Sequence, residues 1–147
     1  MDDCIFCRIV AGRAPASVVH RDERCVAFMD IRPVNPGHLL VVPVRHATHL
    51  ADADEETAAH LMRVAHRLAA AVRASGLRCD GVTLHLADGA AAGQEVFHVH
   101  LHVFPRWRGD GFGLRFGPGY GVRPRAELDS AAEAIRAVLD PGPYADG

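Results

Sequence analysis

A run of six residues, His98-Val99-His100-Leu101-His102-Val103, constrains the fold more than any other part of the sequence. Successive side chains of a β-strand point to opposite faces, so a strand through this run places three imidazoles on one face and three apolar side chains on the other. The apolar face belongs in a core. We therefore expect a strand over residues 96–104 with packing on one face and polar chemistry on the other.

Three interpretations of the histidine face follow from the residues alone. The imidazoles form a half-buried polar face, they ligate a metal ion, or they divide between different duties. Imidazole nitrogen is a good zinc ligand. However, three same-face positions span ~13 Å of strand at ~3.3 Å per residue, which one ion cannot easily reach. We therefore expect the three histidines to have different roles.

The length and charge of the chain narrow the remaining possibilities. Its 147 residues suit a single domain, and its net charge of -2 gives no basic field that would draw it to nucleic acid. No window approaches the ~20 apolar residues of a membrane span, and the acidic start at residues 1–4 lacks a signal-peptide pattern. We expect a cytoplasmic protein that binds neither nucleic acid nor membranes.

The pattern of apolar and turn residues predicts an α+β fold. Strands are expected at Val18–His20, Cys25–Met29, His38–Val44, Gly81–Leu86 and Val96–Phe104. Helices are expected over Asp52–Ser75, where Asp52 and Glu55 form a capping box, and over Leu128–Leu139. The pattern assigns no helix or strand to the apolar segment Cys4–Val10. The predicted architecture is an antiparallel sheet with one long helix packed on it and a short C-terminal helix.

The histidine run and its surroundings resemble the signature of the histidine triad (HIT) family, and in particular its bacterial Hit-like members in the Hint/Fhit superfamily. The stretches that carry the resemblance are Gly93–Phe104, Phe28–Pro33, Pro36–His38, Val41–Pro43 with His46, and Pro105–Phe112. They follow one another in the order and spacing of the family. The resemblance covers about residues 4–112 of a single HIT domain, 1–147, and leaves 113–147 as a C-terminal extension.

This resemblance implies a hydrolase that cleaves a nucleoside 5′-phosphate from its substituent in a phosphoramidate or a dinucleoside polyphosphate. By similarity, His100 attacks the α-phosphorus and forms a nucleotidyl-histidine intermediate. His102 would hydrogen-bond the phosphate or the bridging atom. His38 resembles a fourth active-site histidine, although the residues alone also allow a simple turn histidine there. The implied substrate is an AMP-like purine nucleotide, and the family's usual assembly implies a homodimer.

The resemblance also assigns nucleotide-binding roles to residues around the histidines. Asp30 matches the position that takes the ribose hydroxyls, since a carboxylate accepts two hydrogen bonds. Phe28 and Ile31 would line the base pocket, although both also suit a core. Gln94, with the small-residue loop at Gly93, would donate hydrogen bonds to the phosphate.

Cys4 and Cys7 form a CxxC pair. In a reducing cytosol such a pair favours a metal site over a disulfide, but alone it is a weak signal. The resemblance implies that His46 and His98 complete a closed, structural zinc site with two cysteine and two histidine ligands. His98 would then hold the metal, while the other two triad histidines face the phosphate.

Two departures from the family pattern leave the leaving group open. Ala87 stands where the family often carries an amide side chain, and Glu95 stands where better-known branches carry Ser or Thr. An acid near the leaving group would disfavour long polyphosphates. A second function stays open as well, a nucleotide-binding regulatory or interaction module with little catalytic activity, although such a module has no need of a nucleophile at His100.

Overall fold

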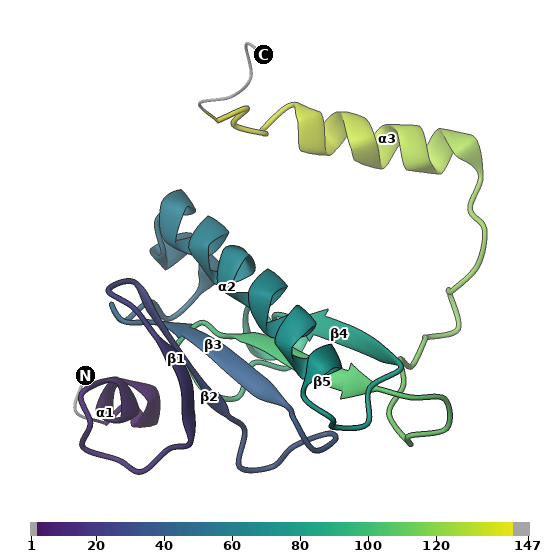
Figure 1. Ribbon diagram of the computed structural model, residues 1–147. Helices are drawn as coiled ribbons and strands as arrows, with labels where there is room; N and C mark the ends of the chain where they lie inside the picture. The colour runs from purple at the N-terminus through teal and green to yellow at the C-terminus, as the bar shows by residue number, and fades with distance from the viewer. Residues whose placement is uncertain (1–2, 143–147) are drawn as a thin grey trace. The chain divides into compact units, whose positions relative to one another are not determined.

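The computed structural model describes residues 3–142, and the chain divides into two compact units, Met1–Phe112 and Gly113–Gly147. The first unit contains a five-stranded antiparallel sheet with the strand order β1-β2-β3-β5-β4 (Figure 1). Its elements are α1 (Ile5–Val10), β1 (Val18–Arg21), β2 (Cys25–Met29), β3 (Leu39–Pro43), the 3₁₀ turn η1 (Leu50–Asp52), α2 (Glu55–Ala74), β4 (Gly81–His85), the 3₁₀ turn η2 (Ala90–Ala92) and β5 (Leu101–Arg106). The second unit holds α3 (Arg125–Arg136). The α+β fold predicted from the sequence is confirmed.

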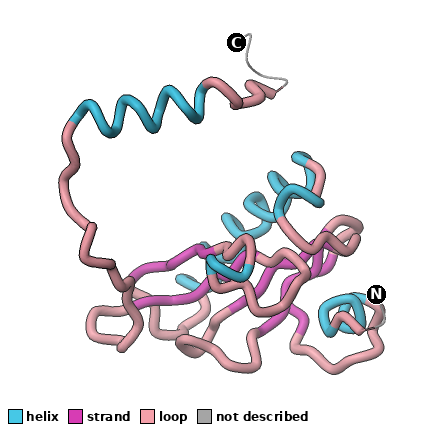
Figure 2. The backbone as a smooth tube through the Cα atoms, turned by 180° about the vertical axis from the view of Figure 1, so that it is seen from behind, coloured by secondary structure: helices cyan, strands magenta, loops and turns pink. Residues whose placement is uncertain are grey.

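The long helix α2 crosses one face of the sheet (Figures 1 and 2). Its buried side chains recur at helical spacing: Leu61, Val64, Ala65, Leu68 and Val72. They pack against alternate residues of the strands, among them Val41 of β3 and Val103 of β5. Burying each such side chain contributes about 1.5–3 kcal/mol, so this face forms the main core.

The intervening strand residues form the opposite face of the sheet. Val26, Phe28, Leu40 and Val42 point there and pack with Phe6 and Ile9 of the short helix α1. The strand register places Phe28 opposite Leu40, Leu40 opposite His102, and His102 opposite His85. This row carries His102 onto the face that α2 leaves free.

The helix boundaries differ from the prediction. α2 begins at Glu55 rather than Asp52, because Asp54 is the N-cap and its carboxylate accepts a hydrogen bond from the Thr57 N–H at 2.7 Å. The predicted capping box is therefore wrong, and the Asp52 carboxylate instead accepts from the His49 N–H at 2.9 Å. α3 both begins and ends three residues earlier than predicted, and α1 was not predicted at all.

The strand predicted over residues 96–104 is shorter and displaced, since β5 spans Leu101–Arg106. Pro43 ends the neighbouring strand β3, and its carbonyl accepts a hydrogen bond from the His98 ring at 2.9 Å instead of from a strand backbone. His98 and His100 therefore precede the strand and are held by other contacts. Among the described helices, none is long and apolar enough to cross a membrane.

Candidate functional site

A cavity of about 570 Å³ opens on the sheet face opposite α2. The residues predicted for the site that line it are Phe28, Asp30, Ile31, His38, Gly93, His100 and His102. The imidazoles of His38 and His100 form its floor, since these residues are only 3% and 7% exposed. The cavity thus brings together histidines and loop residues from distant parts of the chain.

A backbone carbonyl holds the ring of His100 in one tautomer. Its Nδ1 lies 2.8 Å from the carbonyl oxygen of His98, and a carbonyl can only accept, so the proton is on Nδ1. Nε2 then carries a lone pair. The described part of the chain supplies no hydrogen-bond partner for Nε2, and His100 lines the cavity. The ring therefore offers a nucleophilic nitrogen to a molecule bound there.

A second chain of hydrogen bonds sets the proton on His102. The Val34 N–H donates to Nδ1 of His38 at 2.9 Å, so the His38 proton is on Nε2. That N–H donates to Nδ1 of His102 at 2.9 Å. Neutral His102 must then carry its own proton on Nε2. His102 is thereby a hydrogen-bond donor, whereas His100 is a lone-pair donor.

These assignments require neutral rings, and the surroundings favour that form. Burial lowers the pKa of His38 and of His100, and it lowers the pKa of His102 to about 4. Desolvation disfavours the imidazolium cation, and neighbouring histidines add repulsion when more than one ring is charged. At pH 7 the three rings are therefore uncharged.

Asp30 lies at the end of β2 beside the histidines. Its Oδ1 accepts from the Arg32 N–H at 2.8 Å, and its Oδ2 lies 3.6 Å from Nε2 of His38. The carboxylate lines the cavity and keeps acceptor capacity for a bound molecule. Phe28 lies buried in the cavity wall, while Ile31 is almost fully exposed at the rim.

The side-chain amide of Gln94 makes all its hydrogen bonds to the backbone. Its amide nitrogen donates to the carbonyls of Thr48 and Val96 at 2.7 and 3.1 Å, and its oxygen accepts from the Gly89 N–H at 2.8 Å. Both amide protons are therefore engaged by backbone. The backbone N–H groups of residues 92–94 likewise donate to carbonyls within their own loop. Gln94 thus positions the loop, and Gly93 lines the cavity with a positive φ of 93° that favours glycine.

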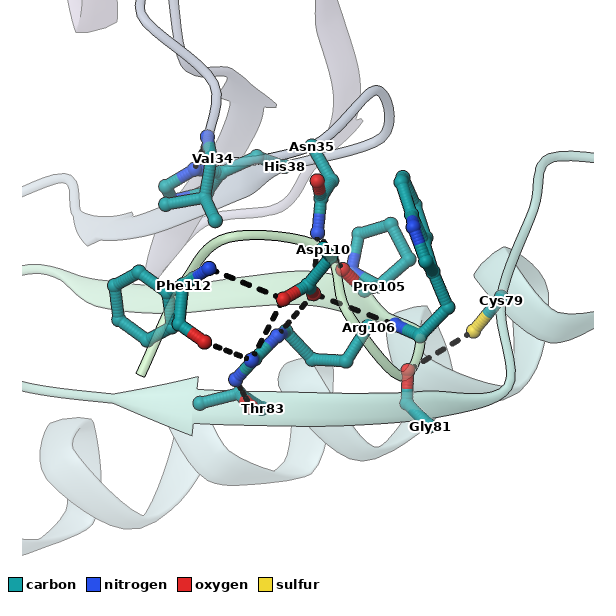
Figure 3. A network of polar contacts seen from close by, with 11 residues as sticks. Val34, Asn35, His38, Cys79, Gly81, Thr83, Pro105, Arg106, Asp110 and Phe112 are labelled. Carbon is teal, nitrogen blue, oxygen red and sulfur yellow. Dashed lines mark hydrogen bonds and ion pairs between the residues drawn. The ribbon is translucent and has the colours of Figure 1, made fainter. Parts of the chain in front are cut away.

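A network at the end of β5 fixes another side of the cavity (Figure 3). The Asp110 carboxylate accepts from the Arg106 guanidinium at 2.6 and 3.0 Å and from the Asn35 amide at 2.9 Å. Arg106 also donates to the Phe112 carbonyl at 2.8 Å. The guanidinium beside it holds the pKa of Asp110 well below its usual range. The network positions Phe112, whose ring lies against Phe104 in the cavity lining.

Beside α1, four metal-ligating side chains form a second cluster, the metal-ligand cluster: Cys4, Cys7, His46 and His98. The Cys7 sulfur lies 3.2 Å from Nδ1 of His46 and 3.6 Å from Nδ1 of His98, and the Cys4 sulfur lies 3.4 Å from the same His98 nitrogen. Bonds of about 2.3 Å to sulfur and 2.0 Å to nitrogen place these atoms about 3.5 Å apart around a tetrahedral zinc ion. The donor set and its spacing therefore fit one tetrahedral metal ion.

Hydrogen bonds on the far nitrogens orient the two imidazoles of the metal-ligand cluster. Nε2 of His98 donates to the Pro43 carbonyl at 2.9 Å, and Nε2 of His46 lies 3.3 Å from the Thr48 hydroxyl. A proton on Nε2 leaves Nδ1 as the lone pair for a metal. Burial lowers the pKa of His98 to about 4 and so favours the neutral form that ligates.

Phe6 connects the metal-ligand cluster with the cavity. It lies in α1 between the two cysteines, and its ring makes edge contacts with the rings of His98 and His100, at centroid distances of 5.8 and 5.1 Å. The segment that carries the two cysteines therefore also packs against the imidazole of His100 on the cavity floor.

Two lining residues, Arg32 and His85, were given no role in the site by the sequence analysis of individual residues, although Arg32 lies within the stretch Phe28–Pro33. His85 pairs with His102 in register, and their ring centroids lie 5.6 Å apart. Strand alternation in β4 relative to β5 is the signal that would have found it. Arg32 pairs with Glu95 across the rim, with 3.3 Å between nitrogen and oxygen.

The chain matches the model of the HIT domain over residues 11–109. It belongs to the HIT family. An uncharacterized HIT-like protein of Mycobacterium tuberculosis is 44% identical to it over 136 residues, which cover 92% of each chain. The family assignment thus confirms the resemblance recognised in the sequence.

Solved structures of HIT proteins share its fold. A HIT family protein from Bacillus anthracis is 35% identical, with a TM-score of 0.86, and the match covers 95% of this chain and 99% of the other. A Zn-bound histidine triad family protein from Mycobacterium smegmatis is 42% identical, with a TM-score of 0.73 and coverage of 88% and 98%.

Proposed function

We propose that this HIT protein binds a nucleoside 5′-phosphate in the cavity and hydrolyses the bond between the phosphate and its substituent, in a phosphoramidate or a dinucleoside polyphosphate. The observation that carries the proposal is that His100 and His102, which both line the cavity, present different ring tautomers to it. His100 offers a lone pair on Nε2, and His102 offers an N–H. Covalent phosphoryl transfer uses such an arrangement, in which a nucleophile lies beside a hydrogen-bond donor that stabilises the developing charge.

In the first step, Nε2 of His100 forms a bond to the α-phosphorus, and the bond from phosphorus to the substituent breaks with its electron pair going to the substituent. The substituent takes up a proton from water. The His102 N–H stabilises the charge that develops on the phosphoryl oxygens or the bridging atom. The His98 carbonyl stabilises the imidazolium that forms, because it accepts from Nδ1 of that ring at 2.8 Å.

In the second step, water attacks the same phosphorus and the nitrogen–phosphorus bond breaks, which returns the electron pair to Nε2 of His100. The water releases one proton and so balances the proton taken up earlier. The products are the nucleoside monophosphate and the protonated substituent. In this proposal Asp30 accepts from the ribose hydroxyls, and Phe28 with Ile31 contacts an adenine-like purine base.

We further propose that the metal-ligand cluster binds a structural zinc ion. The donor set supports this, as does the zinc in the M. smegmatis relative. Zinc held by four protein ligands has no open position for substrate, so it would stabilise the fold around α1 rather than take part in the reaction. Elemental analysis of protein purified without added metal should find about one zinc per chain. Cys7→Ser should abolish it and Cys79→Ser should not, whereas wild-type protein without zinc would contradict the proposal.

The experiment that tests the activity follows AMP release from an N-alkyl phosphoramidate of AMP and from diadenosine triphosphate. We expect the wild type to hydrolyse at least one of them. His100→Ala should lower the rate by about 10³-fold or more, because removal of a nucleophile removes the covalent route. His66→Ala is the matched control, since this histidine lies exposed on α2, and it should behave like the wild type.

If neither compound is hydrolysed at high enzyme concentration, and His100→Ala binds AMP as well as the wild type does, the hydrolase proposal fails. The protein would then be a nucleotide-binding regulatory module.

A homodimer, the usual assembly of the family, also stays a proposal, and sedimentation of the full chain tests it.

A further inference from the structure

One ion pair spans the rim of the cavity. The Arg32 guanidinium lies 3.3 Å from the Glu95 carboxylate, and the two side chains are 82% and 78% exposed. Arg32 follows β2, whereas Glu95 follows η2 and the loop glycine Gly93, so two segments distant in sequence meet over the mouth. An exposed pair of this kind contributes only about 0–1 kcal/mol, and a ligand separates it easily.

The charges that line the cavity are few and unbalanced. Among the described lining residues, Arg32 is the one arginine and there is no lysine. Two lining residues, Asp30 and Glu95, carry carboxylates. Burial lowers the pKa of His38 and of His102, so neither ring supplies a positive charge at neutral pH. A chain of several phosphates that extends toward the rim would therefore meet one arginine, Arg32, which is already paired with a carboxylate, Glu95.

The leaving group departs from the phosphorus in a direction that brings it near this ion pair. Displacement at phosphorus proceeds in line, so the bond that breaks lies opposite the attacking nitrogen. That nitrogen belongs to His100 on the buried floor, and the leaving group accordingly points away from the floor and toward the mouth. Glu95 and Arg32 are the charged residues at that exit.

We propose that Glu95 selects phosphoramidates whose leaving amine carries a second, positively charged group, an inference that rests on the hydrolase activity proposed above. Such a substrate brings a cation to the rim, where its ammonium group pairs with Glu95 in place of Arg32. Its phosphoryl group stays on the cavity floor, beside His100 and His102. A polyphosphate brings anions alone and leaves Glu95 facing negative charge.

The reaction on this substrate class is the same balanced hydrolysis. The phosphorus–nitrogen bond breaks, its electron pair stays on the nitrogen, and the nitrogen takes up one proton and leaves as the amine. Water then supplies hydroxyl to the phosphorus and releases one proton. The distant ammonium group keeps its protons throughout and serves only for recognition by Glu95.

Two AMP phosphoramidates of equal length test the proposal. One carries a butylamine substituent, and the other carries 1,4-diaminobutane linked through one nitrogen, so that its free end is an ammonium group. For the wild type we expect kcat/KM to be about three- to fivefold higher for the ammonium compound, as an exposed ion pair supplies. The preference should decline as salt is raised, because exposed charges are screened.

Glu95→Gln should reduce that ratio to about one, and Glu95→Lys should invert it, since the rim then repels the ammonium group. Each variant is compared with itself on two substrates, so a change in overall activity does not affect the ratio. Glu56→Gln is the matched control. Glu56 is also an exposed glutamate paired with an arginine, but it lies on α2, on the other face of the sheet, and its replacement should keep the wild-type ratio.

Hydrolysis of both compounds at equal kcat/KM by the wild type would overturn the role of Glu95 and leave the proposed hydrolase activity intact. A preference that persists in both Glu95 variants would do the same. Failure of the wild type to cleave either compound or diadenosine triphosphate would overturn both proposals together. A ratio that moves with the charge at position 95 supports the inference.

Discussion

We predict that the hydrogen bond from His38 to His102 raises the rate of the proposed hydrolysis, because it decides which His102 nitrogen carries the proton. His38 receives the Val34 N–H on Nδ1 and donates from Nε2 to His102, each at 2.9 Å. Without that donor, the His102 proton is free to occupy Nδ1, and the ring then presents a lone pair to the phosphate instead of an N–H.

Two substitutions separate the bonds that His38 makes. The amide of His38→Gln extends to the position of Nε2 and can still donate to His102. The shorter amide of His38→Asn retains an acceptor near Nδ1 for the Val34 N–H but does not reach His102. One hydrogen bond contributes about 1–1.5 kcal/mol, so we expect kcat/KM of the asparagine variant to fall about five- to tenfold. The glutamine variant should stay within about twofold of the wild type.

The assay is AMP release from an AMP phosphoramidate between pH 5 and 8. Thermal unfolding of each variant, measured in parallel, separates loss of the hydrogen bond from loss of the fold. Because burial holds the pKa of His102 near 4, wild-type His102 stays neutral across this range and should contribute no step to the pH profile. An asparagine variant as active as the glutamine variant would refute the proposed role of His38.

Other predictions concern stability. Burial tends to raise the pKa of Asp22, but hydrogen bonds from His20 and His60, at 2.7 and 2.8 Å, outweigh it and hold the pKa well below its usual value. This stabilisation is therefore present above about pH 4 and is lost as the pH falls through the folded-state value; urea unfolding of Asp22→Asn should show about 1–3 kcal/mol less stability at pH 7 and a smaller loss in acid. Leu61→Ala, at a side chain only 2% exposed, should cost about 2–5 kcal/mol in the same assay. Chelation of the proposed zinc should lower Tm in the wild type and have no further effect on Cys7→Ser.

Much of the sheet could be predicted from alternation of apolar residues. Cys25–Met29 was predicted with its observed bounds, and Leu101 and Val103 lie in the core on the α2 side as expected. Such predictions succeed because burial on one face acts on every second residue, and that period is visible locally. The same alternation placed His102 on the opposite face, where the cavity is.

Features that depend on distant partners could not be predicted in this way. The Gln94 amide donates to the Thr48 carbonyl, which is 46 residues away in sequence, a contact that the side-chain type alone does not indicate. The helix α1 has six residues, too few to show a period, and it depends on packing of Phe6 and Ile9 against the sheet. β5 starts five residues later than predicted, because its pairing with β3 reaches only to Leu101 opposite Val41.

The alternation of β5 also limits how this family member can evolve. Leu101 and Val103 fill the core, while His102 between them faces the cavity. One inserted or deleted residue at the start of this strand would exchange the two faces, burying an imidazole under α2 and presenting leucine to the substrate. Changes of length here would thus damage stability and chemistry at once. Diversification of specificity is consequently expected through single substitutions at the exposed rim, where Arg32 and Glu95 are free of packing constraints.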